Sequence, residues 1–410
     1  MIPERDWAGN LPRHWSALRF RFLARLEKGR VSPEKVSEEN GGEPCLTTEY
    51  LRSGVPERYV VPSDGAVLAR DGDLLLLWDG SNAGEFFRAR SGVLGSTLVK
   101  CSVSESRLDP RFAHFAAKAM EIHLQSLTVG MGIPHVDGDI LNNFRLPVPP
   151  LDEQRAIVGF LDRETARIDG LIEKKRRQIE LLHEKRAALI SHTVTKGLDP
   201  TAPMKDSGVE WLGEVPQHWN LLRLKYSADL VNEKVNGAAC ELPYTGLEHI
   251  ESWTGKRLVT DAATSSDGQA SLHRAGDVLF GKLRPYLAKA YVAENGGICT
   301  SELLVLRPKA VLQRFLRDYL LNPCFISVVD SSTYGAKMPR ASWEFIGSLP
   351  VLVPPPDEQH AIVRFLDRET ARIDALIEKK RRQIELLHEK RAALISAAVT
   401  GKIDVRKEVG

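Results

Sequence analysis

The chain has 410 residues, of which 43% are hydrophobic and 27% charged, and a formal net charge of +2. This length allows two or three domains, and the composition is typical of a globular protein with real cores. The near-neutral charge excludes a polycation that binds nucleic acid by bulk attraction. Any contact with DNA must come from charges arranged on one face.

Membrane and disulfide classes are also excluded. The densest apolar run, Leu74–Trp78, is far too short to cross a membrane, and Met1–Asp6 contains no apolar signal segment. The five cysteines are scattered without close pairs, which argues against a zinc site or a disulfide framework. We therefore expect a cytoplasmic protein without a membrane partner.

The first segment, residues 1–150, is predicted to be a mixed α/β domain. Apolar runs at 66–68 and 74–77 predict strands between Gly, Asp and Ser turns, and 111–124 predicts a helix. Its polar loops offer side chains suited to base edges and phosphates. The candidate DNA-binding residues of this segment are Asn82, Arg88, Arg90 and His135.

A long helix is predicted over residues 151–197. Prolines precede the Asp152-Glu153 pair, which suits a helix start, and Gly197 follows as a stop. Steps of three and four residues give a heptad seam interrupted by polar residues. The seam residues expected to pair with another helix are Leu161, Ile168, Ile172, Ile179 and Leu182.

The second segment, residues 198–355, is predicted to be another mixed α/β domain, with a strand at 303–306 and a helix at 311–321. Two loops combine cations with an aromatic residue, which favours DNA contact, although any one such cation is more often simply solvated. The candidate DNA-binding residues of this segment are Lys282, Arg284, Tyr286, Lys337 and Arg340.

Residues 356–410 repeat the long helix and add a tail. Residues 357–396 match 152–191 at 37 of 40 positions, at an offset of 205 residues. The second seam is expected at Leu366, Ile373, Ile377, Ile384 and Leu387. A two-fold arrangement of the copies requires antiparallel helices, which we expect here.

The duplication covers the whole chain. Trp7–Trp15 and Trp211–Trp219 open the two globular segments with a similar motif, and each segment ends in a proline run. The helices are nearly identical while the globular segments diverge. One surface is thus presented twice, beside two domains that recognise different things.

Catalytic motifs are missing. The sequence has no Walker loop, HExxH or GxSxG motif. Asn322-Pro323-Cys324-Phe325 superficially matches the Asn-Pro-Pro-Tyr/Phe motif of amino-methyltransferases, but the third position is Cys and no glycine-rich cofactor loop precedes it. We interpret Asn322-Pro323 as a helix stop and expect no catalytic or metal site.

These features together resemble the specificity (S) subunit of type I restriction-modification systems. The resemblance rests on the PPxDEQ segments at 149–154 and 354–359, the duplicated helix, the motif opening at Trp211, and the GDVLFGKLRPYL run at 276–287. The first domain departs from that run, because it has Leu77-Trp78-Asp79-Gly80-Ser81 there. The roles of Lys282 and Arg284 therefore do not carry over to it.

The resemblance implies two target recognition domains that bind the halves of a bipartite, asymmetric duplex DNA sequence. They would be separated by two long antiparallel coiled-coil helices, an α+β fold with pseudo-two-fold duplication. The helices would set the spacer and recruit two adenine-N6 methyltransferase subunits, and indirectly a restriction subunit. The subunit itself would hold no cofactor, since S-adenosylmethionine, ATP and Mg²⁺ would belong to its partners.

One alternative remains open from the residues alone. A non-catalytic coiled-coil scaffold with two ligand-binding heads and no DNA contact would show the same duplication. The near-neutral net charge slightly favours it.

Overall fold

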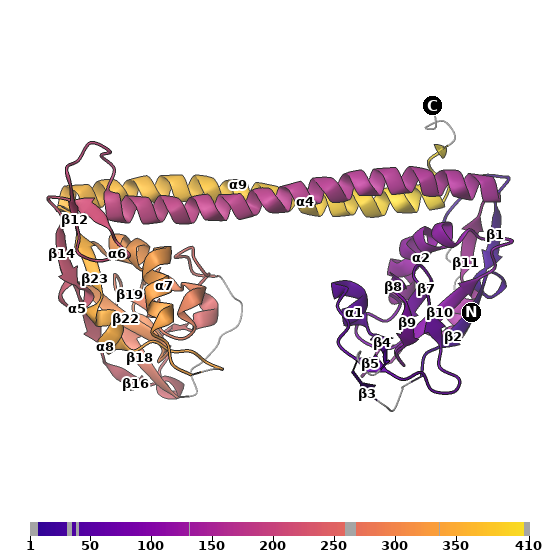
Figure 1. Ribbon diagram of the computed structural model, residues 1–410, viewed down its shortest axis with the longest axis horizontal. Helices are drawn as coiled ribbons and strands as arrows, with labels where there is room; N and C mark the ends of the chain where they lie inside the picture. The colour runs from indigo at the N-terminus through magenta and orange to yellow at the C-terminus, as the bar shows by residue number, and fades with distance from the viewer. Residues whose placement is uncertain are drawn as a thin grey trace. The chain divides into compact units, whose positions relative to one another are not determined.

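The computed structural model describes residues 7–30, 35–37, 41–130, 132–258, 268–335 and 337–405. The predicted lack of a signal segment at Met1–Asp6 concerns residues outside this part of the chain. Two helices, α4 (Leu151–Lys196) and α9 (Pro356–Val399), are the longest elements (Figure 1). Domain 1 is the globular part before α4, and domain 2 is the globular part between α4 and α9.

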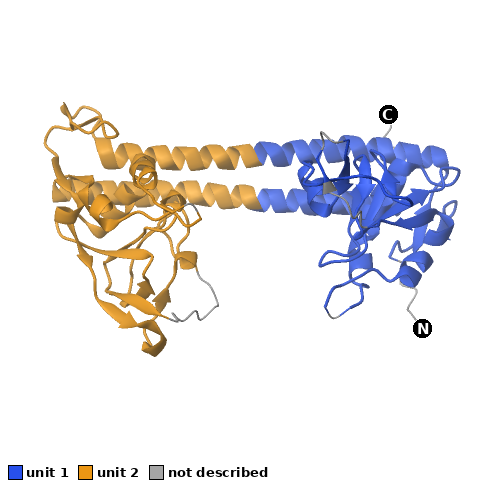
Figure 2. Cartoon of the chain, turned by 60° about the horizontal axis from the view of Figure 1, so that its bottom comes forward, with its two compact units in different colours: residues 1–175, 382–410 blue, residues 176–381 orange. Residues whose placement is uncertain are grey.

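The chain divides into two compact units. Unit 1 comprises residues 1–175 and 382–410, and unit 2 comprises residues 176–381 (Figure 2). Each unit therefore holds one domain together with parts of both long helices.

In its described residues, domain 1 has three antiparallel or mixed sheets, three α-helices and one short 3-10 helix. A pair β1-β11 lies beside a four-stranded sheet in the order β2-β10-β7-β8, and a five-stranded sheet has the order β3-β5-β4-β9-β6. The strands are β1 (Ser16–Arg19), β2 (Ala24–Lys28), β3 (Lys35–Val36), β4 (Glu43–Leu46), β5 (Tyr59–Val60), β6 (Leu68–Ala69), β7 (Leu74–Leu77), β8 (Phe86–Arg88), β9 (Gly92–Leu94), β10 (Leu98–Val103) and β11 (Arg145–Val148). The helices are η1 (Phe20–Phe22), α1 (Thr48–Ser53), α2 (Pro110–Gln125) and α3 (Gly138–Asn143).

Domain 2 repeats this plan. The pair β14-β23 corresponds to β1-β11, and the sheet β15-β22-β19-β20 corresponds to β2-β10-β7-β8. The strands are β12 (Met204–Asp206), β13 (Glu214–Pro216), β14 (Asn220–Arg223), β15 (Ala228–Val231), β16 (Lys234–Asn236), β17 (Tyr244–Thr245), β18 (Gln269–His273), β19 (Val278–Gly281), β20 (Ala290–Val292), β21 (Gly297–Thr300), β22 (Leu303–Pro308) and β23 (Pro350–Val353). The helices are α5 (Leu224–Ser227), η3 (Gly237–Ala239), η4 (Leu247–His249), η5 (Pro285–Leu287), α6 (Gln313–Leu320), α7 (Pro323–Ser331) and α8 (Trp343–Ser348).

Several predicted elements are confirmed, and the interpretation of Asn322-Pro323 as a helix stop is confirmed and extended. The run at 74–77 is β7, the run at 303–306 lies in β22, and the predicted helices are α2 and α6. The Asn322-Pro323 pair ends α6 but also starts α7. The side chain of Asn322 accepts a hydrogen bond from the backbone N–H of Cys324, and Pro323 takes the first helical position, which tolerates proline.

The Asp-Glu-Gln segment at the start of each long helix anchors that helix to the domain that precedes it in the chain. Gln154 is buried; its Oε1 accepts from the Asp109 backbone N–H at 2.7 Å, and its amide donates to the Arg107 carbonyl at 2.9 Å. In the second repeat, the Oε1 of Gln359 accepts the equivalent hydrogen bond from the Leu312 backbone N–H at 2.6 Å. The buried amide therefore ties the helix start to the loop before α2 or α6.

The end of each long helix packs on an opening tryptophan. Gly197 follows α4 with φ +79°, and a Cβ there would lie 3.1 Å from the Trp219 ring. Gly401 follows α9 with φ +72°, and a Cβ there would lie 2.5 Å from Pro12 and 3.3 Å from the Trp15 ring. Both sites require glycine for conformation and for space. The C-terminal end of α9 thus packs on domain 1 as the end of α4 packs on domain 2.

The two helices are antiparallel within each unit. In unit 1 the ends of the helices share one core, where Val158 and Leu161 of α4 cluster with Val399 of α9. Further along, Asp169 pairs with Arg391 at 3.0 Å. In unit 2, Arg186 of α4 pairs with Asp374 of α9 at 3.2 Å. Residue numbers rise along α4 as they fall along α9, as expected from the two-fold duplication.

The predicted seam residues fall into two groups by burial. The buried group, with a relative exposure of 5% or less, consists of Leu161, Ile168, Ile172, Leu366, Ile373 and Ile377. Those half-buried are Ile179, Leu182, Ile384 and Leu387. Polar residues enter the seam at Thr165, whose hydroxyl donates to the Leu161 carbonyl at 2.7 Å, and at the buried Arg186.

Truncating the seam should destabilise the protein. Ile172→Ala with Ile377→Ala removes two buried side chains at equivalent positions, and each such loss costs about 2–5 kcal/mol. We expect a markedly lower melting temperature by circular dichroism. The matched control, Leu181→Ala with Leu386→Ala, alters exposed positions on the same helices and should melt like the unaltered chain. Equal melting of both double variants would show that the seam does not stabilise the fold.

Candidate nucleic-acid interface

The candidate loops of domain 2 lie side by side. Residues 282–287 follow β19, and residues 334–340 follow α7. The Arg284 N–H donates to the Pro339 carbonyl at 2.8 Å, and the Ala341 N–H donates to the Lys282 carbonyl at 3.0 Å. Tyr334 and Arg340 also bridge the second loop upon itself. These residues form the domain 2 loop pair, in which Ala336 lies outside the described residues.

Its side chains differ in availability. Arg284, Tyr286 and Lys337 are exposed, and Lys282 is half-buried. Arg340 instead makes a forked contact with the carboxylate of Glu302, with its Nε at 3.0 Å and its Nη2 at 3.1 Å. This contact raises the pKa of Arg340 and uses the donors that would otherwise reach a base or a phosphate. Arg340 is therefore better placed to hold the loop than to contact DNA.

Glu302 connects both loops and was not identified from the sequence. Its backbone carbonyl accepts from the Lys282 N–H at 3.0 Å, while its carboxylate holds Arg340. Glu302 lies in the turn between β21 and β22, about twenty residues from one loop and nearly forty from the other. No local motif joins such distant positions, so only the tertiary fold reveals its role.

Domain 1 forms a loop pair with the same backbone pattern. The Gly80 N–H donates to the Pro134 carbonyl at 2.9 Å, and the Val136 N–H donates to the Trp78 carbonyl at 2.9 Å. The Trp78 N–H donates to Thr97, as Lys282 does to Glu302. Residues 78–82 and 129–135 are the domain 1 loop pair, with Met131 outside the described residues.

Two of the predicted residues of domain 1 lie in this loop pair. Asn82 and His135 are both exposed there. Asp79 pairs with Lys28 at 2.9 Å, and the same ammonium lies 5.8 Å from the centre of the Trp78 ring. The amide of Asn82 and the imidazole of His135 thus remain available for contact with a ligand.

The other two predicted residues lie elsewhere. Arg88 is opposite Leu74 in the β7-β8 hairpin, at the end away from the connecting loop. Burial, followed by the positive charges of Lys118 and then Arg88, lowers the pKa of His114 in α2 to about 4. Arg90 lies 6.0 Å from the Tyr50 ring in α1. The structure does not bring these arginines together with Asn82 and His135.

A hollow of about 260 Å³ adjoins the domain 2 loop pair. Lys282 and Tyr334 line it from the loops, Asn232 lines it from the segment between β15 and β16, and Lys234 and Trp343 line it from β16 and α8. Lys234 donates to the Ser271 hydroxyl at 2.8 Å. Asn232, Lys234 and Trp343 carry no shared sequence signal, because they lie far apart in the chain or in short separate segments.

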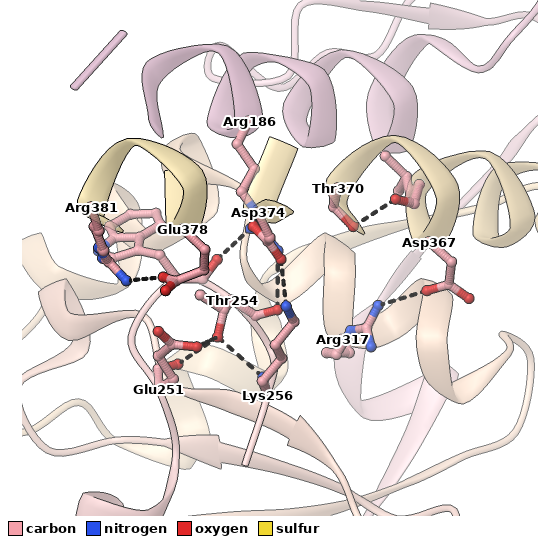
Figure 3. Close-up of polar contacts among 12 residues, drawn as sticks. Arg186, Glu251, Thr254, Lys256, Arg317, Asp367, Thr370, Asp374, Glu378 and Arg381 are labelled. Atoms are coloured by element: carbon pink, nitrogen blue, oxygen red, sulfur yellow. Dashed lines mark hydrogen bonds and ion pairs between the residues drawn. The ribbon is translucent and has the colours of Figure 1, made fainter. Parts of the chain in front are cut away.

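Domain 2 is also fastened to the long helices (Figure 3). Asp374 binds Arg186 at 3.2 Å and Lys256 at 2.6 Å, and Arg186 donates to the carbonyls of Trp253 and Thr254 at 2.6 and 3.1 Å. The Arg186 side chain is only 8% exposed. Its repeat equivalent, Arg391, is 37% exposed beside Asp169. This cluster of Arg186, Asp374 and Lys256, the clasp, therefore fixes the placement of domain 2 on the helices within unit 2.

No metal or membrane feature emerges among the described residues. They contain no group of three or more His, Cys, Asp or Glu side chains able to hold a metal ion. No helix among them is long and apolar enough to span a membrane. The loop pairs are the features that best fit an extended polar ligand.

Comparison with known proteins places the chain in a family. The family model described as "Type I restriction modification DNA specificity domain" matches residues 12–181 and 241–386. The MjaVIII type I restriction enzyme specificity subunit of Methanocaldococcus jannaschii is 29% identical over 97% of this chain and 94% of its own length. The EcoDI specificity subunit of Escherichia coli is 21% identical over 97% and 90%.

A solved structure supports the fold. It comes from work on complex assembly and conformational transition of a type I restriction-modification system. It covers 96% of this chain and 100% of its own, with a TM-score of 0.70 and 17% identity. The match of the family model to both domains and both helices is decisive: the chain belongs to the type I restriction-modification DNA specificity family.

Proposed function

We propose that the chain is the DNA-recognition subunit of a type I restriction-modification complex, acting in the cytoplasm. Each domain would bind one half of a bipartite, asymmetric duplex sequence through its loop pair. The observation that carries this is the pairing of equivalent loops on one scaffold, with the same backbone hydrogen bonds but different side chains. A shared frame with different side chains is what two readers of different sequences require.

The long helices would recruit two adenine-N6 methyltransferase subunits, and indirectly a restriction subunit. The support is repetition: residues 357–396 match 152–191 at 37 of 40 positions, whereas the loops diverge. Exposed leucines recur in both copies, Leu171 with Leu376 and Leu181 with Leu386. Exposed apolar side chains on a helix are suited to a protein partner. S-adenosylmethionine, ATP and Mg²⁺ would be held by those partners.

The function is tested by reconstituting the chain with the methyltransferase subunit of a type I restriction-modification system from the same source. Long-read sequencing of the DNA that the complex methylates should show two half-sites, methylated at adenine N6, with one fixed spacer. The chain alone should transfer no methyl group. A complex that neither methylates a bipartite sequence nor shifts duplex DNA would contradict the proposal and favour a scaffold without DNA contact.

The number of methyltransferase subunits that bind through the two helix copies can be measured. Leu181→Asp puts a charge on one exposed copy of the repeat, and Leu386→Asp does so on the other. Native mass spectrometry should show that each single variant retains one methyltransferase subunit and that the double variant retains none. If the double variant still binds two subunits, the partner uses another surface.

The helices should also act as a ruler. Seven residues inserted after Arg177 and seven after Arg382 preserve the heptad register, and both positions adjoin the boundary between the units. Each helix would lengthen by about 10 Å, which equals roughly three base pairs and about 100° of rotation around the duplex. The variant should therefore lose the original site, because a reader that faces the wrong groove makes no base contacts.

Methylation mapping across a library of spacer lengths is the measurement. Both half-site sequences should be retained, since neither domain is altered. An unchanged preference for the original spacer would mean that the helices do not set the distance.

A further inference from the structure

The two loop pairs can be compared position by position, because their backbone hydrogen bonds correspond. The bonds from Gly80 to Pro134 and from Arg284 to Pro339 place Gly80 and Arg284 at equivalent positions. By the same pattern Trp78 corresponds to Lys282, and His135 corresponds to Arg340. Differences between the loop pairs are therefore differences of side chain on a shared frame.

The charges of the loop pairs differ sharply. The domain 2 loop pair carries Lys282, Arg284 and Lys337, besides Arg340 that Glu302 neutralises. The domain 1 loop pair contains no Lys or Arg in its sequence, and its one acidic residue, Asp79, is neutralised by Lys28. One loop pair is thus strongly cationic and the other is nearly neutral.

Arg284 has a backbone conformation that is unfavourable for an arginine residue. Its φ is +49° and its ψ is +63°, in the left-handed region, and it directly precedes Pro285. Domain 1 has glycine at this position, Gly80, with φ +123°. The frame therefore needs a positive φ, which glycine supplies without strain. An exposed arginine kept at such a position points to a function of its side chain.

Phosphate is the ligand that this arrangement fits. The side chain of Arg284 has no hydrogen bond or ion pair within the described part of the chain, so its donors are available. Lys282 and Lys337 lie in the same loop pair, and three neighbouring cations match the repeated charge of a DNA backbone. Phosphate contacts position a protein on duplex DNA, whereas base contacts supply the sequence information.

We propose that the two domains divide the work of binding. The domain 2 loop pair anchors DNA through phosphate contacts of Lys282, Arg284 and Lys337. The domain 1 loop pair contributes little electrostatic binding and discriminates sequence through Asn82 and His135. This inference rests on the proposed DNA-binding function, which it deepens by assigning unequal roles to the two half-sites.

Salt dependence tests the division. In the reconstituted complex, alanine at Lys282, Arg284 and Lys337 should reduce the slope of log K against log[salt] by about 2.7, since each phosphate contact contributes about 0.9. Affinity for cognate and scrambled duplexes should fall by the same factor. The matched variant of domain 1, Asn82→Ala with His135→Ala, should leave the slope unchanged and weaken cognate binding alone.

Arg284 can be tested separately. Arg284→Lys keeps a point charge and should retain the slope and the target sequence, whereas bidentate reading of a guanine would not survive this change. Arg284→Gly should lower the slope by about 0.9 without lowering the melting temperature, because glycine accepts the positive φ. A lower melting temperature with an unchanged slope would make Arg284 structural and contradict the proposal.

The outcomes separate this inference from the function beneath it. A complex that does not bind DNA contradicts the proposed function itself. In a second outcome the complex binds its bipartite site, but the triple variant keeps the full salt slope or loses affinity for the cognate duplex only. That outcome contradicts the division of work and does not affect the proposed function.

Discussion

Two arginine–aspartate pairs at equivalent positions of the repeat mark the register in which the long helices meet. Asp169 binds Arg391 in unit 1, and Arg186 binds Asp374 in unit 2. Each residue of the second helix is the counterpart of one in the first, 205 positions earlier. The same pair therefore forms twice, as an antiparallel two-fold arrangement requires. Everything else depends on this register, because each domain core is completed by the start of one helix and the end of the other.

Near-identity and divergence follow from this constraint. A substitution in a helix must satisfy its own seam, its docking on a domain and any partner that binds both copies, so the helices stay alike. The loop pairs share a set of backbone hydrogen bonds and a positive φ at one position, whereas most of their side chains differ. The clasp of Arg186, Asp374 and Lys256 shows that the copies are still not equivalent, since the loop of domain 2 buries an ion pair that domain 1 leaves partly exposed.

Much of this organisation is readable from sequence because it is periodic. The long helices, β7 and α2 carry local signals that the structure reproduces. The loop pairs are only partly predictable. Lys282 and Lys337 stand out in their loops, but the pairing of Arg340 with Glu302 joins a loop and a turn that lie far apart in the chain. Arg88 and Arg90 looked equivalent to Asn82, yet a three-residue strand carries them to the other end of the hairpin.

Chemical cross-linking of the helices tests the antiparallel register most directly. Cys240 and Cys324 would first be replaced by serine, since the other three cysteines are buried. Asp169→Cys with Arg391→Cys should then join efficiently through a short bismaleimide, because these positions form an ion pair. Asp169→Cys with Asp374→Cys should not join, whereas in a parallel pair these equivalent residues would be neighbours. Efficient linkage of the second pair and none of the first, identified by peptide mass spectrometry, would contradict the account.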